Sequence, residues 1–138
     1  MRLFLLSSML LFTVCAYAQK TADYSPSNKK VFAIEFEEPH QSLGKVRKGE
    51  TRKAKFVFTN TGTEDIIIEL VSACECTTLD WPRKPVKPGE KAVIDAVFDS
   101  SKKEESETIE IDINFENVDP ATGYKRFEIV SYSYELIP

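Results

Sequence analysis

Apolar and polar side chains alternate strictly in the segment 109–116, and this alternation constrains the fold more than any other feature of the chain. The apolar positions are Ile109, Ile111, Ile113 and Phe115. Successive side chains of a β-strand point to opposite faces of the sheet, so the pattern predicts a strand with one buried and one wet face. The acids at the alternate positions, Glu110, Asp112 and Glu116, are expected to be solvated on the wet face rather than to bind a cation.

A period of two recurs along the chain between turn-forming residues. Further candidate strands cover 31–37, 43–46, 53–58, 66–71, 92–98 and 124–136. The segment 66–71 is apolar enough to predict a central strand covered on both faces. The last segment carries apolar residues of both parities, Phe127 and Ile129 against Val130, Tyr132 and Tyr134, which predicts a bulge or a change of face.

No segment shows a convincing helical period, and about a hundred residues carry the strand pattern, which is the size of one domain. These observations predict an immunoglobulin-like antiparallel β-sandwich of about seven strands over residues 31–138. The cross-sheet disulfide of antibody domains is not expected, because the two cysteines predicted to remain after export, Cys74 and Cys76, are only two positions apart.

The first 18 residues are typical of a secretory signal peptide. Arg2 supplies a positive charge, 3–14 is apolar, and Ala16-Tyr17-Ala18 is a small-x-small cleavage site. The apolar stretch is too short to span a membrane as a helix. The polar, aperiodic residues 19–30 are expected to form a flexible tether. The chain is therefore predicted to be periplasmic or secreted; lipid anchoring at Cys15 is the weaker alternative, because Val14 before it is not small.

Charge excludes one class of partner. Removing residues 1–18 removes one Arg and no acid, which leaves 17 basic against 22 acidic residues, a net charge of −5. Binding to a nucleic acid backbone requires a basic stripe, so nucleic acid is not an expected partner. No other segment is predicted to cross a membrane, and the expected partner is another envelope protein.

The motif Cys74-Glu75-Cys76 is the main candidate site, and three roles stay open for it. In an extended strand the Cα atoms of residues i and i+2 lie about 6.5–7 Å apart, at or beyond the upper limit for a disulfide, so a bridge requires a local bend. Two thiolates also suit Cu(I), whereas Zn(II) wants four ligands, and His40 is the only further N or S donor of the mature chain, a weak candidate. A thiol-redox role is the third alternative, although the motif lacks the two-residue spacing of thioredoxin-type sites.

Four residues are candidates for contact with a partner. Glu75 lies between the cysteines, and Trp81 is interpreted first as a plug at one end of the sandwich and second as an exposed anchor. Tyr132 and Tyr134 would form a contact surface if their face of the strand stays open. Since no nucleophile motif such as Gly-x-Ser-x-Gly occurs, no catalytic residue and no enzyme activity is predicted.

Several short motifs in the first half of the chain resemble one family. They are Leu43-Gly44-Lys45-Val46, Gly49-Glu50, Phe56-Val57-Phe58-Thr59-Asn60-Thr61-Gly62, Ser72-Ala73-Cys74-Glu75-Cys76-Thr77, Trp81-Pro82 and Pro88-Gly89-Glu90. Together they resemble a bacterial family of secreted domains of unknown function with a Cys-Gly-Cys-Thr signature. That family is similar to hydin-like, major-sperm-protein-like and pilus-chaperone-like immunoglobulin modules, which implies a role in binding and assembly. Glu75 replaces the Gly of the family signature, and the segment after Asp99 lacks the Gly-rich turn expected there.

Taken together, these patterns predict an exported, non-catalytic binding or assembly module. It would act by protein contact through an edge strand or through the Cys-x-Cys loop. A Cu(I)-handling protein that uses Cys74 and Cys76, and a thiol-redox factor, are the alternatives.

Overall fold

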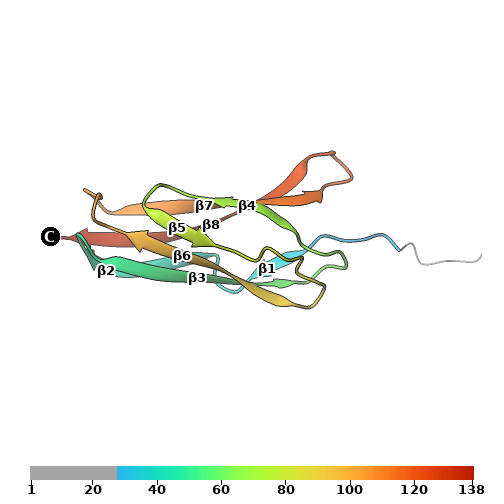
Figure 1. Ribbon diagram of the computed structural model, residues 1–138, viewed down its shortest axis with the longest axis horizontal. Coiled ribbons are helices and arrows are strands. Elements are labelled where there is room, and N and C mark those ends of the chain that lie inside the picture. The colour runs from blue at the N-terminus through green and yellow to red at the C-terminus, as the bar shows by residue number, and fades with distance from the viewer. Residues whose placement is uncertain (1–27) are drawn as a thin grey trace, which may run out of the picture.

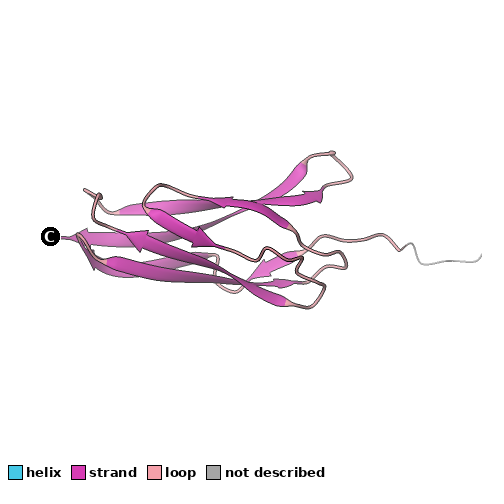
Figure 2. Ribbon diagram, viewed as in Figure 1, coloured by secondary structure: helices cyan, strands magenta, loops and turns pink. Residues whose placement is uncertain are grey.

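The computed structural model describes residues 28–138, and two β-sheets packed face to face account for its architecture (Figure 1). The first sheet has the order β1 (Ile34–Phe36), β3 (Thr51–Asn60), β6 (Lys91–Asp99), β5 (Thr77–Asp80). The second has the order β2 (His40–Arg47), β8 (Lys125–Ile137), β7 (Glu107–Val118), β4 (Ile68–Ser72). Only strands and loops occur in the described part of the chain (Figure 2), which contains no helix able to cross a membrane. The predicted signal peptide and most of the predicted tether lie outside the described residues.

The predicted immunoglobulin-like β-sandwich is confirmed, with two differences in detail. The sandwich has eight strands because Thr77–Asp80 pairs with β6, a short strand that the sequence pattern did not predict. It is also not wholly antiparallel, since β2 runs parallel to β8. The reason is a change of sheet near Pro39: β1 pairs with β3 in the first sheet, and the chain then crosses to the second sheet and runs beside β8.

The core lies between the sheets and is built from the alternating positions of the long strands. From β3 and β6 it receives Phe56, Phe58, Ile94 and Phe98, and from β7 and β8 Ile111, Ile113, Phe115, Val130 and Tyr132, each nearly or completely buried. The strand predicted at 109–116 therefore presents its apolar face to the core as expected, and its acids face solvent.

The prediction of a central strand at 66–71 is wrong. β4 is the outer strand of its sheet and pairs only with β7. Its Leu70 is 49 % exposed, because a register irregularity between Ile68 and Leu70 places this side chain on the outer face. Ile66 lies outside the strand and makes an isolated bridge to Val86.

The last strand does not change face. In β8 the even positions Val130, Tyr132 and Tyr134 point to the core, while Phe127 and Ile129 lie on the other face and are 64 % and 40 % exposed. The irregularity is in the partner strand: two extra residues of β7 are accommodated between Asn114 and Val118. The apolar residues of mixed parity thus reflect two exposed side chains on an otherwise regular strand.

Candidate functional site at the Cys74–Cys76 disulfide

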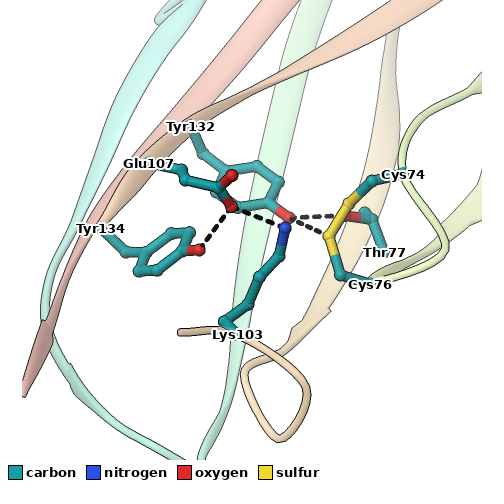
Figure 3. Close-up of a disulfide and its surroundings, with 7 residues drawn as sticks. All are labelled: Cys74, Cys76, Thr77, Lys103, Glu107, Tyr132 and Tyr134. Carbon is teal, nitrogen blue, oxygen red and sulfur yellow. Dashed lines mark hydrogen bonds and ion pairs between the residues drawn. A yellow bond between two sulfur atoms is a disulfide. The ribbon is translucent and has the colours of Figure 1, made fainter. Parts of the chain in front are cut away.

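Cys74 and Cys76 form a disulfide in the turn that carries the chain from β4 in one sheet to β5 in the other (Figure 3). Their Cα atoms lie 5.2 Å apart, well below the separation expected in an extended strand. The bend comes from a turn in which the Thr77 backbone N–H donates to the Cys74 carbonyl oxygen at 3.0 Å. The local bend that a bridge requires is therefore present.

The inner side of the disulfide contacts two hydroxyl groups, those of Thr77 and Tyr132. The Thr77 hydroxyl lies 3.5 Å from both sulfur atoms and is hydrogen-bonded to the hydroxyl of Tyr132. The Tyr132 hydroxyl also lies 4.0 Å from Cys76 Sγ. Burial raises the pKa of Tyr132, so this phenol stays protonated at neutral pH. Its hydroxyl therefore stays available for the hydrogen bond with Thr77 and the contact with Cys76 Sγ.

A second polar cluster adjoins this one (Figure 3). The hydroxyl of Tyr134 donates to Glu107 Oε2 at 2.9 Å, and Lys103 Nζ donates to the same oxygen at 2.6 Å. The hydrogen bonds from Lys103 and Tyr134 lower the pKa of Glu107. Burial raises the pKa of Tyr134, and the neighbouring carboxylate of Glu107 raises it further, because both disfavour a tyrosinate.

The outer side of the disulfide faces a cleft of about 400 Å³. Its lining includes Cys74, Glu75, Cys76, Asp99, Lys102 and Lys103. Hydrogen bonding from Ser101 lowers the pKa of Asp99, so the carboxylate is ionised at neutral pH. The half-buried sulfurs and the exposed Glu75 are thus presented beside two lysines, on a turn that is closed covalently.

The expected contact surface at Tyr132 and Tyr134 does not exist. These side chains are only 1 % and 4 % exposed, because even positions of β8 point between the sheets. Both rings pack on Phe98, with ring centroids 5.4 Å and 4.4 Å away. Tyr132 contacts the disulfide turn through Thr77, and neither tyrosine is available to a partner.

Trp81 directly follows β5. It is partly buried and packs against the core, and the guanidinium carbon of Arg83 lies 3.6 Å from the centre of its ring. The indole Nε1 is buried without a hydrogen-bond acceptor in the described part of the protein.

His40 is not assembled with the cysteines. Its Nδ1 lies 2.8 Å from the hydroxyl of Ser131, at the start of the β2–β8 pairing. Within residues 28–138 no three His, Cys, Asp or Glu side chains are grouped so that they could hold a metal ion. The structure therefore gives no support to a three-residue centre made of His40, Cys74 and Cys76.

Sequence reasoning missed Thr77, Lys103 and Glu107 beside the disulfide, and also Asp99 and Lys102 in the lining of the cleft. Thr77 was visible as the neighbour of Cys76, but its contact with Tyr132 spans 55 positions of the chain. Lys103 lies in the loop before β7, and Glu107 is the first residue of that strand. Their four-residue spacing signals an ion pair in a helix but carries no such signal here.

Comparison with solved structures supports the fold. A protein of unknown function from Porphyromonas gingivalis W83 is similar with a TM-score of 0.62 and 21 % identity, over 76 % of this chain and 47 % of that one. The ASH/PapD-like domain 7 of human CEP192 gives 0.59 and 12 % identity, over 75 % and 84 %. The Vibrio cholerae protease VesB gives 0.58 and 10 % identity, over 75 % of this chain but only 31 % of the protease.

At these identities the likeness concerns the fold alone, which immunoglobulin-like and PapD-like domains share. The chain spans less than half the length of the first solved structures that it matches, including the two Vibrio proteases. No curated protein matches the sequence. One family model covers residues 34–128, and the chain therefore belongs to the family of proteins of unknown function DUF1573.

Proposed function

We propose that this protein is an exported, non-catalytic binding module of the cell envelope, which contacts another envelope protein through the turn Cys74–Thr77. Immunoglobulin-like and PapD-like sandwiches commonly serve as binding domains, which supports the general class. The disulfide-closed turn, which holds the exposed Glu75 at the rim of a cleft, is the observation that carries the specific proposal.

The length of the loop argues for a local role of the bridge. Closing a loop of three residues contributes only about 1.5 kcal/mol to stability in the chain-entropy model. A disulfide here does little for the whole domain, but it limits the conformations of the turn that carries Glu75. Restricting a contact loop before binding lowers the entropy lost on association, which is the usual benefit of preorganisation.

Photo-crosslinking in the native host tests this proposal. A photoreactive residue at Glu75 is expected to yield one dominant crosslinked envelope protein, and the yield should fall when Cys74 and Cys76 are both serine. The matched control is the same photoreactive residue at Glu110, exposed on the outer face of β7. Equal crosslinking from both positions, or none from Glu75, would contradict the turn as the contact.

The intact mass of the protein isolated from the host tests export. Cleavage after Ala18 predicts a chain that begins at Gln19 and is two hydrogens lighter than its reduced form. A diacylglyceryl mass on Cys15 would instead identify the lipid-anchored form, and an uncleaved chain would contradict export by a cleaved signal.

Thiol-redox activity is a second candidate, supported by the partial exposure of the disulfide beside Lys102 and Lys103. An external dithiol would transfer two electrons to the bridge, becoming a disulfide while Cys74 and Cys76 become thiols. The check is equilibration with a dithiothreitol redox buffer. A midpoint near that of cellular dithiol enzymes would favour this role, whereas resistance to reduction would favour a structural bridge.

Cu(I) handling requires the same reduced pair, since the soft ligand is the thiolate. Stoichiometric binding of Cu(I) to the reduced protein, lost in Cys74→Ser, would support this alternative. Reduced protein that binds no Cu(I) would remove it.

A further inference from the structure

The N-terminal half of β8 is an unpaired strand edge. β8 pairs with β7 from Lys125 onward, but its pairing with β2 begins only at Ser131. The chain that could have covered residues 125–130 belongs to the other sheet, because β1 pairs with β3 before the crossover at Pro39. Figure 1 shows this part of β8 in a β7–β8 hairpin that extends away from the rest of the second sheet.

The direction of the free backbone groups follows from the neighbouring hydrogen bonds. The Ser131 N–H donates to the Pro39 carbonyl oxygen, so the backbone groups of Ser131 point toward the β2 side. Alternate residues of a strand share this direction, so the N–H and C=O groups of Lys125, Phe127 and Ile129 point to the same side, where no strand of the described chain pairs with them. Such a row of unpaired groups is a template for another strand.

A groove of about 490 Å³ runs along this edge. Its lining includes Phe32 and Ile34 from the start of the described chain, and Tyr124, Arg126, Phe127 and Glu128 from the β7–β8 hairpin. The described chain therefore leaves space beside the edge for the side chains of an added strand. On the outer face of this part of β8, Phe127, which is 64 % exposed, and Ile129 supply apolar surface.

The sequence Lys125-Arg126-Phe127-Glu128-Ile129 is complementary to itself when a second copy lies antiparallel with Phe127 opposite Phe127. In that register Lys125 faces the partner's Ile129, and Arg126 faces the partner's Glu128, twice by symmetry. The residues with free backbone groups meet one another, which is the arrangement of hydrogen-bonded antiparallel pairs. Opposite charges and aromatic pairs directly across such strands are favourable.

Arg126 supplies an independent indication. Its Nε is buried and has no hydrogen-bond acceptor within the described chain, although the guanidinium stacks on Phe32 and lies 3.7 Å from Asp119. Glu128 makes no ion pair with residues 28–138. The antiparallel register places Glu128 of one copy opposite Arg126 of the other, whose Nε lacks an acceptor.

From this geometry we infer that a second copy of the chain docks on the free edge of β8, pairing residues 125–129 antiparallel about a two-fold axis at Phe127, so that the β2-β8-β7-β4 sheets of two molecules become continuous. The contact is isologous, as closed two-fold dimers require. A five-residue pairing is a small interface, so the dimer is expected to be weak and reversible. The inference adds a self-association edge to the binding module proposed above and does not depend on the Cys74–Thr77 turn.

Disulfide trapping tests the register. The protein, exported with its own leader and purified, is oxidised mildly after Phe127→Cys. Hydrogen-bonded antiparallel pairs place Cα atoms about 5.5 Å apart, within disulfide reach. We expect a reducible crosslinked dimer to form at least ten times faster than in the control Glu110→Cys, which lies on the same sheet but away from the edge. Equal rates in the two variants would overturn the inference.

A charge exchange tests the pairing without a new thiol. Sedimentation equilibrium over about 1 µM to 1 mM should show a monomer–dimer equilibrium for the native chain. Glu128→Arg should weaken dimerisation at least tenfold, because it sets like charges opposite each other, and adding Arg126→Glu should restore it. A native chain that stays monomeric over this range, or a double variant without recovery, contradicts the inference.

These outcomes separate the two proposals. A monomeric chain that still crosslinks an envelope protein from Glu75 would remove the dimer and leave the binding module. A dimer without crosslinking from Glu75 would support the dimer and contradict the turn as the contact with an envelope protein.

Discussion

Cys74 and Cys76 illustrate how little a residue pair reveals until its backbone is known. With only Glu75 between them, the two cysteines could form a bridge, bind Cu(I) or take part in thiol redox chemistry. The turn closed by the Thr77 N–H brings the cysteines within bridging distance, and Thr77 and Tyr132 fill the space beneath them. Sequence reasoning assigned Tyr132 and Tyr134 to a contact surface; Tyr132 instead lies buried under the disulfide turn, and Tyr134 is hydrogen-bonded to Glu107.

Removing the bridge is expected to be mild for the fold. The double variant Cys74→Ser/Cys76→Ser should lose about 1–2 kcal/mol of unfolding free energy, since the closed loop contains three residues. Urea denaturation of the oxidised native chain and of the variant measures this difference. A loss above about 4 kcal/mol would show that the bridge supports the whole sandwich.

Because of Tyr132 and Tyr134, we expect the free energy of unfolding to fall in alkali. Both phenols have a pKa raised above the value of about 10 that applies to the unfolded chain. Their contribution to stability is therefore fully present below pH 10 and falls as the pH rises toward their folded-state pKa values. The unfolding free energy measured at about pH 8–11.5 should decline above pH 10, and less steeply in Tyr134→Phe. A variant with the same slope as the native chain would argue against burial as the cause.

At the scale of elements, the turn after β3 shows a part of the fold that the sequence motif anticipated. Asn and Gly favour turns, and β3 does end at Asn60, directly before Thr61 and Gly62. The buried Asn60 amide donates to the carbonyl oxygens of Glu64 and Val86, and its oxygen accepts from the Gly62 N–H. Gly62 itself lies against the segment before β1, where an added Cβ would lie 2.7 Å from the backbone nitrogen of Ala33.

Replacing Asn60 by Ala should destabilise the protein strongly. The substitution removes three hydrogen bonds and leaves the buried Val86 carbonyl without this donor, a loss of about 2–4 kcal/mol. Thermal unfolding of Asn60→Ala measures it, with Thr61→Ala, an exposed neighbour, as the matched control. Similar melting temperatures for the two variants would contradict this role for the amide.

The strands themselves were predictable where one face is buried and the other wet. The segment 109–116 met that condition and appears within β7, whereas 66–71 did not, and its apolar run was assigned to the interior of a sheet. The periodicity of a segment indicates which face of a strand is buried, but it does not indicate which strands lie next to it in the sheet. Leu70 and Ile129 are exposed apolar residues, and no local pattern distinguishes them from core positions.

For the whole molecule, the last strand completes the domain. The family model ends at residue 128, yet β2 pairs with Ser131–Ile137, and the core contains Val130, Tyr132 and Tyr134. The family-matched part alone would leave most of one edge of β7 unpaired and β2 without its neighbour.

A chain that ends at residue 128 is accordingly expected not to fold. Deletion of 129–138 removes three core side chains and the pairing partner of β2. The free energy lost in this way exceeds the total stability of a domain of this size, about 5–15 kcal/mol. Amide NMR dispersion of the truncated chain should be lost, whereas deletion of Pro138 alone, the control, should retain it. A dispersed spectrum from the truncated chain would show that β8 is dispensable beyond its hairpin.

The sequence by itself determined the β-sandwich class, most strand positions and the separation of the cysteine motif from the core strands, because alternation and turn residues are local properties. Tertiary structure alone decided the crossover of the chain at Pro39, the parallel β2–β8 pair, the edge position of β4, and the free edge at 125–130. These features depend on which strands lie side by side. Partners such as His40 and Ser131 are 91 positions apart in the sequence, so no local pattern relates them. The burial of Tyr132 and Tyr134 has the same origin, since which face of β8 turns inward is set by the opposing sheet.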